Sequence, residues 1–246
     1  MNFCGLNKTT LLDYPGRVAS TLFLGGCNFR CPYCQNKDLI LHPSEFEIYS
    51  EEDVLSHLKK RAGVLSGICI TGGEPTIHGD LPLFMEKCKA LGYQIKLDTN
   101  GTNPDMLKSL YEKKLIDYVA MDIKTGPSEY TKVAGLMQKD QELSPSHLLH
   151  MMEKITESVR FLMNDTDPDS FEYEFRTTVV RELHNARSFE EIADWITGAE
   201  KYFLQSYQES EGVLMPGFSA YSKEELLGFA LQIRDRVPGV QIRGVE

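Results

Sequence analysis

Apolar and polar residues follow two periods along this chain, one typical of strands and one typical of helices. Short apolar runs predict buried strands at residues 17–24, 67–71, 94–99, 118–124, 171–180, 202–207 and 239–243. Between them, apolar residues recur at helical spacing behind polar capping residues at Ser50, Asp80, Asn103, Ser144, Ser188 and Ser222. Strands and helices therefore alternate, which predicts parallel strands joined by right-handed crossovers.

The predicted strand–helix units number about six, fewer than the eight that close a full barrel. We therefore expect an α/β fold in which parallel strands form an incomplete, open (β/α)6 barrel. A chain of 246 residues with this architecture is ordinarily one domain, so a single domain over residues 1–246 is expected. Functional side chains of such folds lie at the C-terminal ends of the strands.

Three of the predicted strands carry polar residues at alternate positions, on the face that would look into the barrel. These residues are Gln94, Lys96, Asp98 and Asn100, then Asp122 and Lys124, and then Glu172, Glu174 and Arg176. Burying charges is costly unless they pair with one another or with a bound ligand. The pattern therefore indicates either a ligand inside the barrel or a salt-bridge network that only fixes the register of the strands.

The composition narrows the classes of partner. Apolar residues make up 41% of the chain and charged residues 25%, as in a soluble globular protein, and no apolar run is long enough to span a membrane. The net charge of −10 disfavours broad contact with nucleic acid or with an anionic membrane. We expect a cytoplasmic protein that acts on a small molecule or on a protein partner.

The loop after the first predicted strand carries the strongest chemical signal. Cys27, Cys31 and Cys34 are separated by three and then two residues. Thiolates at this spacing can each reach a different iron of a 4Fe-4S cluster and leave the fourth iron open to a substrate. A zinc site is the alternative, with His42 as the nearby candidate for a fourth ligand, whereas a disulfide framework does not suit a chain of this size. The remaining cysteines are scattered singly and are interpreted as buried thiols without chemistry: Cys4, Cys69 and Cys88.

A second loop follows the predicted strand at residues 67–71 and begins with Gly72-Gly73-Glu74-Pro75. Glycines let backbone carbonyls approach a ligand closely, and the Glu74 carboxylate would complete a site for an ammonium group. Paired glycines in such a loop often serve only the turn. The motif gains its meaning from the cysteine loop that precedes it.

Together, these motifs resemble the radical S-adenosylmethionine (SAM) superfamily. The resemblance rests on the three cysteines with Tyr33 between the last two, and on Gly72-Gly73-Glu74-Pro75, and it covers nearly the whole chain. Four further segments are similar to the glycyl-radical activating enzymes, nearest to the anaerobic ribonucleoside-triphosphate reductase activating proteins: residues 13–17, 97–101, 121–124 and 176–180. The resemblance implies an open partial barrel of the radical SAM type.

The resemblance also implies an activity. A 4Fe-4S cluster on Cys27, Cys31 and Cys34 would bind SAM and cleave it reductively to a 5′-deoxyadenosyl radical. That radical would abstract hydrogen from a backbone glycine of a partner glycyl-radical enzyme, with the anaerobic ribonucleotide reductase as one candidate. The partner would enter by the open side of the barrel near residues 13–17, and flavodoxin or ferredoxin would donate the electron.

Carried over by position, a set of residues would form the SAM site. Gly72, Gly73 and Glu74 would receive the methionine ammonium, Tyr33 and Asn36 would lie near the adenine, and Asp122 and Lys124 near the carboxylate and ribose. The set also includes Asp98, Asn100, Arg176 and Gln205. Two positions depart from the family pattern, because Gln205 stands where related activating enzymes carry a histidine and His78 stands where glutamine is common.

The resemblance also implies that a monovalent cation binds beside SAM. Asp98 and Asp122 would face each other from neighbouring strands and repel unless a cation lies between them. The expected ligands are the side chains of Asp98, Thr99 and Asp122 and the carbonyl of Ala120.

Basic residues flank the cysteine loop of this acidic chain. Arg30 and Lys37, with Lys8 as a further candidate, are expected to dock an acidic electron donor, and ordinary solvated charge is the alternative. Two other functions stay open: a radical SAM enzyme acting on a small molecule such as a nucleoside or cofactor precursor, and a non-catalytic interaction module stabilised by zinc.

Overall fold

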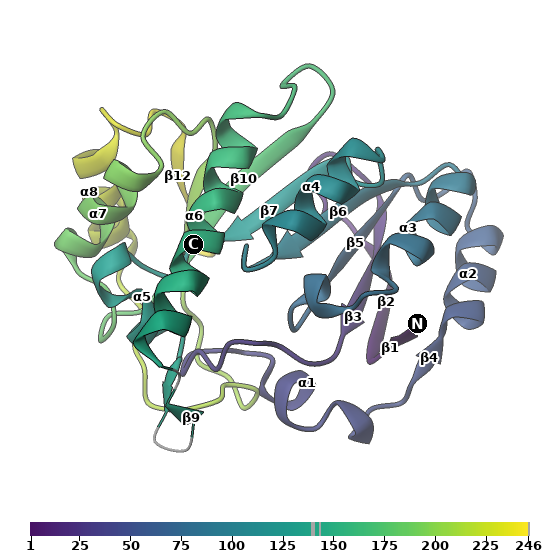
Figure 1. The fold of residues 1–246 in the computed structure, drawn as a ribbon, viewed down its shortest axis with the longest axis horizontal. Helices are drawn as coiled ribbons and strands as arrows, with labels where there is room; N and C mark the ends of the chain where they lie inside the picture. Colours follow the sequence, from purple (N-terminus) through teal and green to yellow (C-terminus); the bar gives the residue numbers. More distant parts are fainter. Residues whose placement is uncertain (139–140, 143, 246) are drawn as a thin grey trace.

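The computed structural model describes residues 1–138, 141–142 and 144–245. Within them, eight strands form the central sheet in the order β12-β11-β10-β7-β6-β5-β3-β2 (Figure 1). Their bounds are β2 Gly5–Thr10, β3 Ala19–Leu24, β5 Gly67–Gly72, β6 Gln94–Thr99, β7 Tyr118–Asp122, β10 Glu172–Val179, β11 Tyr202–Ser206 and β12 Val240–Arg243. Two short antiparallel pairs lie outside it: β1 Asn2–Phe3 with β4 Tyr49–Ser50, and β8 Met137–Gln138 with β9 Gln141–Glu142.

The helices follow the strands as the sequence pattern predicts. Their bounds are α1 Lys37–Leu41, α2 Glu51–Lys60, α3 Leu81–Ala90, α4 Pro104–Glu112, α5 Tyr130–Val133, α6 Pro145–Asn164, α7 Ala186–Trp195 and α8 Lys223–Ile233. Three short 3-10 helices, Pro43–Glu45, Pro75–Ile77 and Pro127–Glu129, lie in the loops. In Figure 1, α2, α3, α4 and α6 lie in front of the sheet and cover one of its faces.

Pairing along the sheet confirms the expected α/β fold. From β3 to β12 every neighbouring pair is parallel, and only β2 runs antiparallel, against β3. The strand order ends at β2 on one side and at β12 on the other, so the described strands form an open sheet. The sequence pattern did not predict β2, because its central residues are exposed and polar. That the chain is one domain stays a prediction.

Two helix caps agree with the predicted capping boxes and one does not. Ser50 with Asp53 caps α2, and Ser222 with Glu225 caps α8. Ser188 was expected to cap α7, but α7 begins earlier. The Asn185 side chain accepts from the backbone of the first turn, and the Ser188 hydroxyl at the third helical position accepts from the Asn185 N–H. The prediction failed because Asn185 is an equally good cap one turn upstream.

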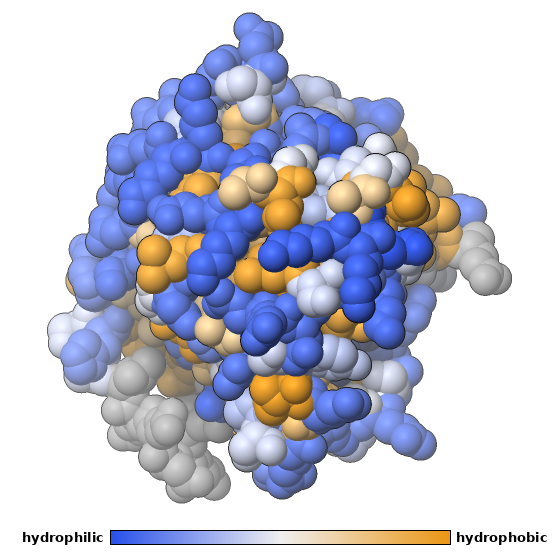
Figure 2. Space-filling model, turned by 90° about the vertical axis from the view of Figure 1, so that its right-hand side faces the viewer, coloured by the Kyte–Doolittle hydropathy of each residue, from blue (hydrophilic) through white to orange (hydrophobic). Residues whose placement is uncertain are grey.

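The two faces of the central strands differ in polarity. Ile95, Leu97, Val119 and Met121 are fully buried in the hydrophobic core. The alternating polar residues of the same strands take the opposite side, which becomes the interior of the open barrel. The outer surface over α2 and the N-terminus is mostly polar, with small separate apolar patches (Figure 2). No helix in the described part of the chain is long and apolar enough to cross a membrane.

Candidate functional site

The three clustered cysteines lie in the loop after β3 and line one cavity of about 260 Å³. In Figure 1, this loop runs below the sheet from the end of β3 toward α5 and returns to α1. The C-terminal ends of β5, β6, β7, β10 and β11 complete the cavity wall, as expected for a site in a barrel of parallel strands. The sequence prediction of where the chemistry lies is therefore consistent with the fold.

The arrangement of the three cysteines suits an iron–sulfur cluster better than a single metal ion. Across the described residues, no three His, Cys, Asp or Glu side chains converge where a single metal ion would bind. A cubane cluster instead takes each thiolate on a different iron, so three separated sulfurs beside a cavity fit it. His42, the candidate fourth zinc ligand, lies 3.4 Å from Glu45. Burial raises the pKa of Cys27 to about 11 and that of Cys31 to about 12, so the thiols need a bound cation to ionise near neutral pH.

The cysteine loop is held by contacts with α5. Phe29 is fully buried, with its ring edge-on to Tyr130 at 6.4 Å between centroids. Nη1 of Arg30 donates to the carbonyl oxygens of Cys27 at 2.6 Å and of Phe29 at 2.8 Å. Gly135 packs so closely that a Cβ there would lie 1.9 Å from the Arg30 carbonyl oxygen. Arg30 therefore shapes the loop from within.

A second support comes from the far end of the sequence. The backbone N–H of Leu214 donates to the Cys34 carbonyl at 2.9 Å, and that of Met215 donates to the Pro32 carbonyl at 2.8 Å. The Lys37 backbone N–H donates to the Gly212 carbonyl at 3.1 Å. We call residues 208–215 the bracing segment. The sequence analysis did not predict this segment, because its contacts with the cysteine loop are backbone hydrogen bonds, which no residue pattern indicates.

Gly72, the last residue of β5, and the following Gly73 hold this strand end against the cysteine loop. Gly72 has a φ of +117°, and a Cβ at Gly73 would lie 1.8 Å from the Gly26 carbonyl oxygen. The Glu74 N–H donates to that same oxygen at 2.9 Å. The glycines therefore serve close contact between two loops, while the Gly72 carbonyl accepts a bond of 3.0 Å from Asn36. His78 lies 3.0 Å from the Gly25 carbonyl oxygen, so its Nε2 is the donor and fixes the same loop.

Glu74 is buried and surrounded by donors. Its carboxylate accepts from the N–H and hydroxyl of Thr76 at 3.0 and 2.5 Å, from the Thr99 hydroxyl at 2.8 Å and from the Asn100 N–H at 2.6 Å. Burial raises the pKa of Glu74, while these four donors oppose that shift. The carboxylate thus joins the ends of β5 and β6. Its expected contact with a ligand ammonium stays a prediction.

Five charged side chains form an alternating chain inside the barrel. Lys96 contacts Asp98, and Nη2 of Arg176 lies 3.1 Å from the other Asp98 oxygen. Nε of Arg176 contacts Asp122, whose second oxygen lies 2.8 Å from Nζ of Lys124. The predicted inward face is therefore correct for these residues. Gln94 and Glu172, expected on the same face, line a separate cavity of about 460 Å³ at the opposite strand ends.

Other expected SAM-site residues also reach the cavity. Tyr33 is buried, and its hydroxyl has no hydrogen-bond partner among the described residues. Asn100 donates to the Asn28 side chain at 2.8 Å, which joins β6 to the cysteine loop. Thr99 and Gln205 line the cavity beside the three cysteines. An orphaned buried hydroxyl in a cavity wall is a group that a polar ligand would satisfy.

A larger cavity of about 550 Å³ adjoins the first on the open side of the barrel. The two share Thr71, Asp98, Arg176 and Gln205 as wall residues, so they are adjacent. Leu11 and Leu12, 70% and 89% exposed, stand at the rim of the larger one. Its wall also contains four charged side chains: Asp13, Lys96, Glu174 and Arg243.

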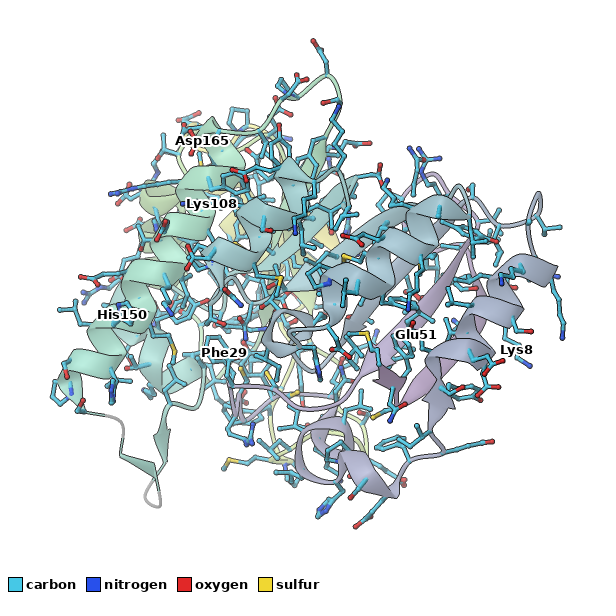
Figure 3. All side chains as sticks on the ribbon, turned by 45° about the vertical axis from the view of Figure 1, so that its right-hand side comes forward. Lys8, Phe29, Glu51, Lys108, His150 and Asp165 are labelled. Carbon is cyan, nitrogen blue, oxygen red and sulfur yellow. The ribbon has the colours of Figure 1, made fainter. Side chains whose placement is uncertain are left out.

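Some predicted residues lie elsewhere. Lys8 was a candidate neighbour of the cysteine loop, but Figure 3 has it at the right-hand edge, well away from Phe29. Nζ of Lys37 donates to the Glu211 carbonyl of the bracing segment. Cys69 was assigned no chemistry, yet it lines the larger cavity with its sulfur 3.8 Å from both Asp98 and Lys96.

The sequence matches the family described as "Radical SAM superfamily" over residues 21–143. It is 28% identical to the "Putative glycyl-radical enzyme activating enzyme MJ1227" of Methanocaldococcus jannaschii over 212 residues, covering 84% of this chain and 80% of that protein. It is 38% identical to the 7-carboxy-7-deazaguanine synthase of Neisseria meningitidis over 109 residues, covering 44% of this chain and 45% of that enzyme.

Solved structures show the same fold at low sequence identity. SuiB of Streptococcus suis aligns with a TM-score of 0.63 and 14% identity, covering 92% of this chain and 49% of SuiB, so the chain spans about half of that protein. QueE of Escherichia coli aligns with a TM-score of 0.54 and 16% identity, covering 98% of this chain and 93% of QueE.

Proposed function

Because this chain belongs to the radical SAM superfamily, we propose that it is a glycyl-radical-enzyme activating enzyme whose Cys27, Cys31 and Cys34 hold a 4Fe-4S cluster. When bound, the cluster and SAM supply a reductive cleavage that yields a 5′-deoxyadenosyl radical, the species that takes hydrogen from a backbone glycine. The observation that carries the proposal is that the cysteine-lined cavity and the larger cavity share part of their walls.

The chain's own residues bind and orient SAM in this proposal. Carbonyls near Gly72 and Gly73 accept the methionine ammonium, and Glu74 holds the ends of β5 and β6 in place around them. Lys124 and Arg176 offer donors to the SAM carboxylate and ribose, with Asn36, Asn100 and Gln205 on the cavity wall. Tyr33 lies on the adenine side of the site. These buried contacts exclude water from the reacting atoms.

The larger cavity would receive the substrate. Its wall includes Phe23 of β3 and Arg243 of β12, strands near the two ends of the open sheet, and in this proposal an extended polypeptide segment enters between them. Leu11 and Leu12 at its rim are exposed apolar residues, as a protein-docking site provides. The named partner class is a glycyl-radical enzyme, with the anaerobic ribonucleotide reductase as first candidate, and a flavodoxin or ferredoxin of the cytoplasm as electron donor.

A small-molecule substrate is the second candidate function. The similarity to 7-carboxy-7-deazaguanine synthase favours it, although it covers less than half of this chain. Lys96 and Arg243 in the wall of the larger cavity would suit an anionic small molecule. Arg243 is already paired with Glu174 at 2.8 and 2.9 Å, so such a molecule would have to compete with that pair.

Anaerobic reconstitution with iron and sulfide tests the proposal. We expect absorbance of a 4Fe-4S cluster that bleaches on reduction, and 5′-deoxyadenosine formed from SAM. Mixing the reduced protein with an anaerobic ribonucleotide reductase should then give a glycyl-radical signal in electron paramagnetic resonance. Turnover of nucleosides or cofactor precursors without such a signal would favour the second candidate. Zinc in place of iron, with no SAM cleavage, would contradict both.

A further inference from the structure

Asp98 and Asp122 lie on neighbouring strands of the barrel interior, and both are fully paired with basic side chains. One oxygen of Asp98 contacts Lys96 and the other faces Arg176 at 3.1 Å. One oxygen of Asp122 contacts Arg176 and the other faces Lys124 at 2.8 Å. Each of the four carboxylate oxygens therefore has its own charged donor.

The other expected ligands of a metal cation are also committed. The Thr99 hydroxyl donates to Glu74 at 2.8 Å and accepts from the Gly101 N–H at 3.1 Å. Ala120 lies inside the sheet, as register partner of Asp98 on one side and Glu174 on the other. The residues at this place do not fit a sodium or potassium ion, because no described ligand is free to replace its hydration shell.

We propose that the Arg176 guanidinium is the cation between Asp98 and Asp122, so that this chain binds SAM without a monovalent metal ion. The inference rests on the proposed function, since it concerns the same SAM site. A planar guanidinium presents several donors in a fixed fork and can serve two carboxylates at once. The register supports this, because Arg176 is the direct partner of Asp122 across β10 and β7.

The charges of the five-residue chain also balance without a metal. Lys96, Arg176 and Lys124 carry three positive charges against the two of Asp98 and Asp122, which leaves one net positive charge. One carboxylate, such as that of an amino acid, neutralises that charge. A bound metal cation would add a second positive charge in a buried place, which costs free energy without a further anion.

The pKa values of Asp98 and Asp122 are lowered, as their pairing with basic side chains requires. Burial opposes ionisation of Asp122, yet Arg176 and Lys124 hold its pKa far below the usual value. Burial likewise opposes ionisation of Asp98, and Arg176 and Lys96 keep its pKa low. Both aspartates are therefore charged at neutral pH with side chains alone as counter-ions.

The test compares reconstituted protein in choline, sodium and potassium chloride at equal ionic strength. The measurements are the melting temperature and the dissociation constant of SAM. For the wild type, we expect the SAM dissociation constant to differ by less than about twofold among the three salts. Arg176→Ala opens a place for a metal ion, so sodium or potassium should strengthen its SAM binding about tenfold over choline. Arg176→Lys keeps a positive charge and should stay indifferent to the salt.

Arg187→Ala is the matched control, because Arg187 is exposed and its side chain pairs with Glu191 on its own helix. It should behave like the wild type in all three salts. A wild-type melting temperature or SAM affinity that rises in sodium or potassium over choline would overturn the inference. A wild type that does not bind SAM in any salt would contradict the proposed function, and the melting temperatures would still test Arg176.

Discussion

His184 donates from Nε2 to the carbonyl oxygen of Lys124 at 2.7 Å and thereby joins the loop after β10 to the end of β7. Its Nδ1 lies 3.0 Å from the backbone nitrogen of Val180 and 3.1 Å from the Val180 carbonyl oxygen. None of these contacts was foreseen from the sequence. The ring also packs edge-on against Tyr33 at 6.3 Å, which links it to the cysteine loop.

This arrangement predicts a pH dependence of stability. Burial lowers the pKa of His184 below 6.5, the value expected of the unfolded chain. The stabilisation is therefore complete above the unfolded pKa and is lost as the pH falls through the lower folded pKa. His184→Gln keeps a donor for Lys124 but cannot titrate. When the pH is lowered from about 8 to about 5, the free energy of unfolding measured in urea should fall less for the variant than for the wild type. Equal losses would contradict the role of His184.

The cysteines divide into two groups with different expected outcomes. Cys27→Ser, Cys31→Ser and Cys34→Ser should each abolish SAM cleavage and lower the iron content, because a hydroxyl does not replace a thiolate on iron. Cys88→Ser is the matched control, since Cys88 is buried in α3 away from the cavity. Iron analysis and 5′-deoxyadenosine formation measure the outcome. Full activity in any of the first three variants would refute the cluster assignment.

Gly73 should tolerate no side chain. A Cβ there would meet the Gly26 carbonyl oxygen at 1.8 Å, so Gly73→Ala must push the cysteine loop away from β5. We expect a loss of stability of about 2 kcal/mol or more and poor cluster retention. Gly79→Ala is the control, because a Cβ at Gly79 meets open space. Denaturant unfolding and iron content of both variants decide the matter, and equal behaviour would show that the contact is unimportant.

Arg30 should matter to the cluster with any reductant. The sequence suggested that Arg30 and Lys37 dock an electron donor, but the Arg30 side chain donates to the carbonyls of Cys27 and Phe29. Arg30→Met should therefore slow SAM cleavage equally with dithionite and with flavodoxin, and shift the reduction potential of the cluster. Lys59→Met, an exposed change on α2, should alter neither. Impairment with flavodoxin alone would restore the docking interpretation.

The sequence predicted the central sheet, and most of the predicted site residues line one cavity at its strand ends, for identifiable reasons. A short apolar run such as Gly67–Gly72 predicts a buried strand. Parallel strands bring their C-terminal ends to the same edge of the sheet, which locates the site. The alternation of polar and apolar residues in β6 correctly predicted that Lys96 and Asp98 face the barrel interior. These features depend on residues that are close in the sequence, so the periodicity and composition of the sequence predict them.

What the sequence did not reveal depends on partners distant along the chain. The ion pairs of Arg176 with two aspartates need the register of three strands, which residue patterns leave open. The donors around Glu74 come from Thr76, Thr99 and Asn100, and only the fold brings the last two beside it. Backbone contacts such as Leu214 with Cys34 have no residue signature at all.

The bracing segment has a consequence for the order of biosynthesis. Lys37 and Glu211, which meet there, are 174 residues apart in the chain. During translation the three thiols emerge long before the residues that fix their loop, and a contact of such high sequence separation forms late in folding. Iron and sulfide supplied to a nascent chain would meet a loop of undefined shape. Cluster insertion should therefore follow release from the ribosome, and a chain stalled before residue 208 should retain little iron when the stalled complex is isolated anaerobically.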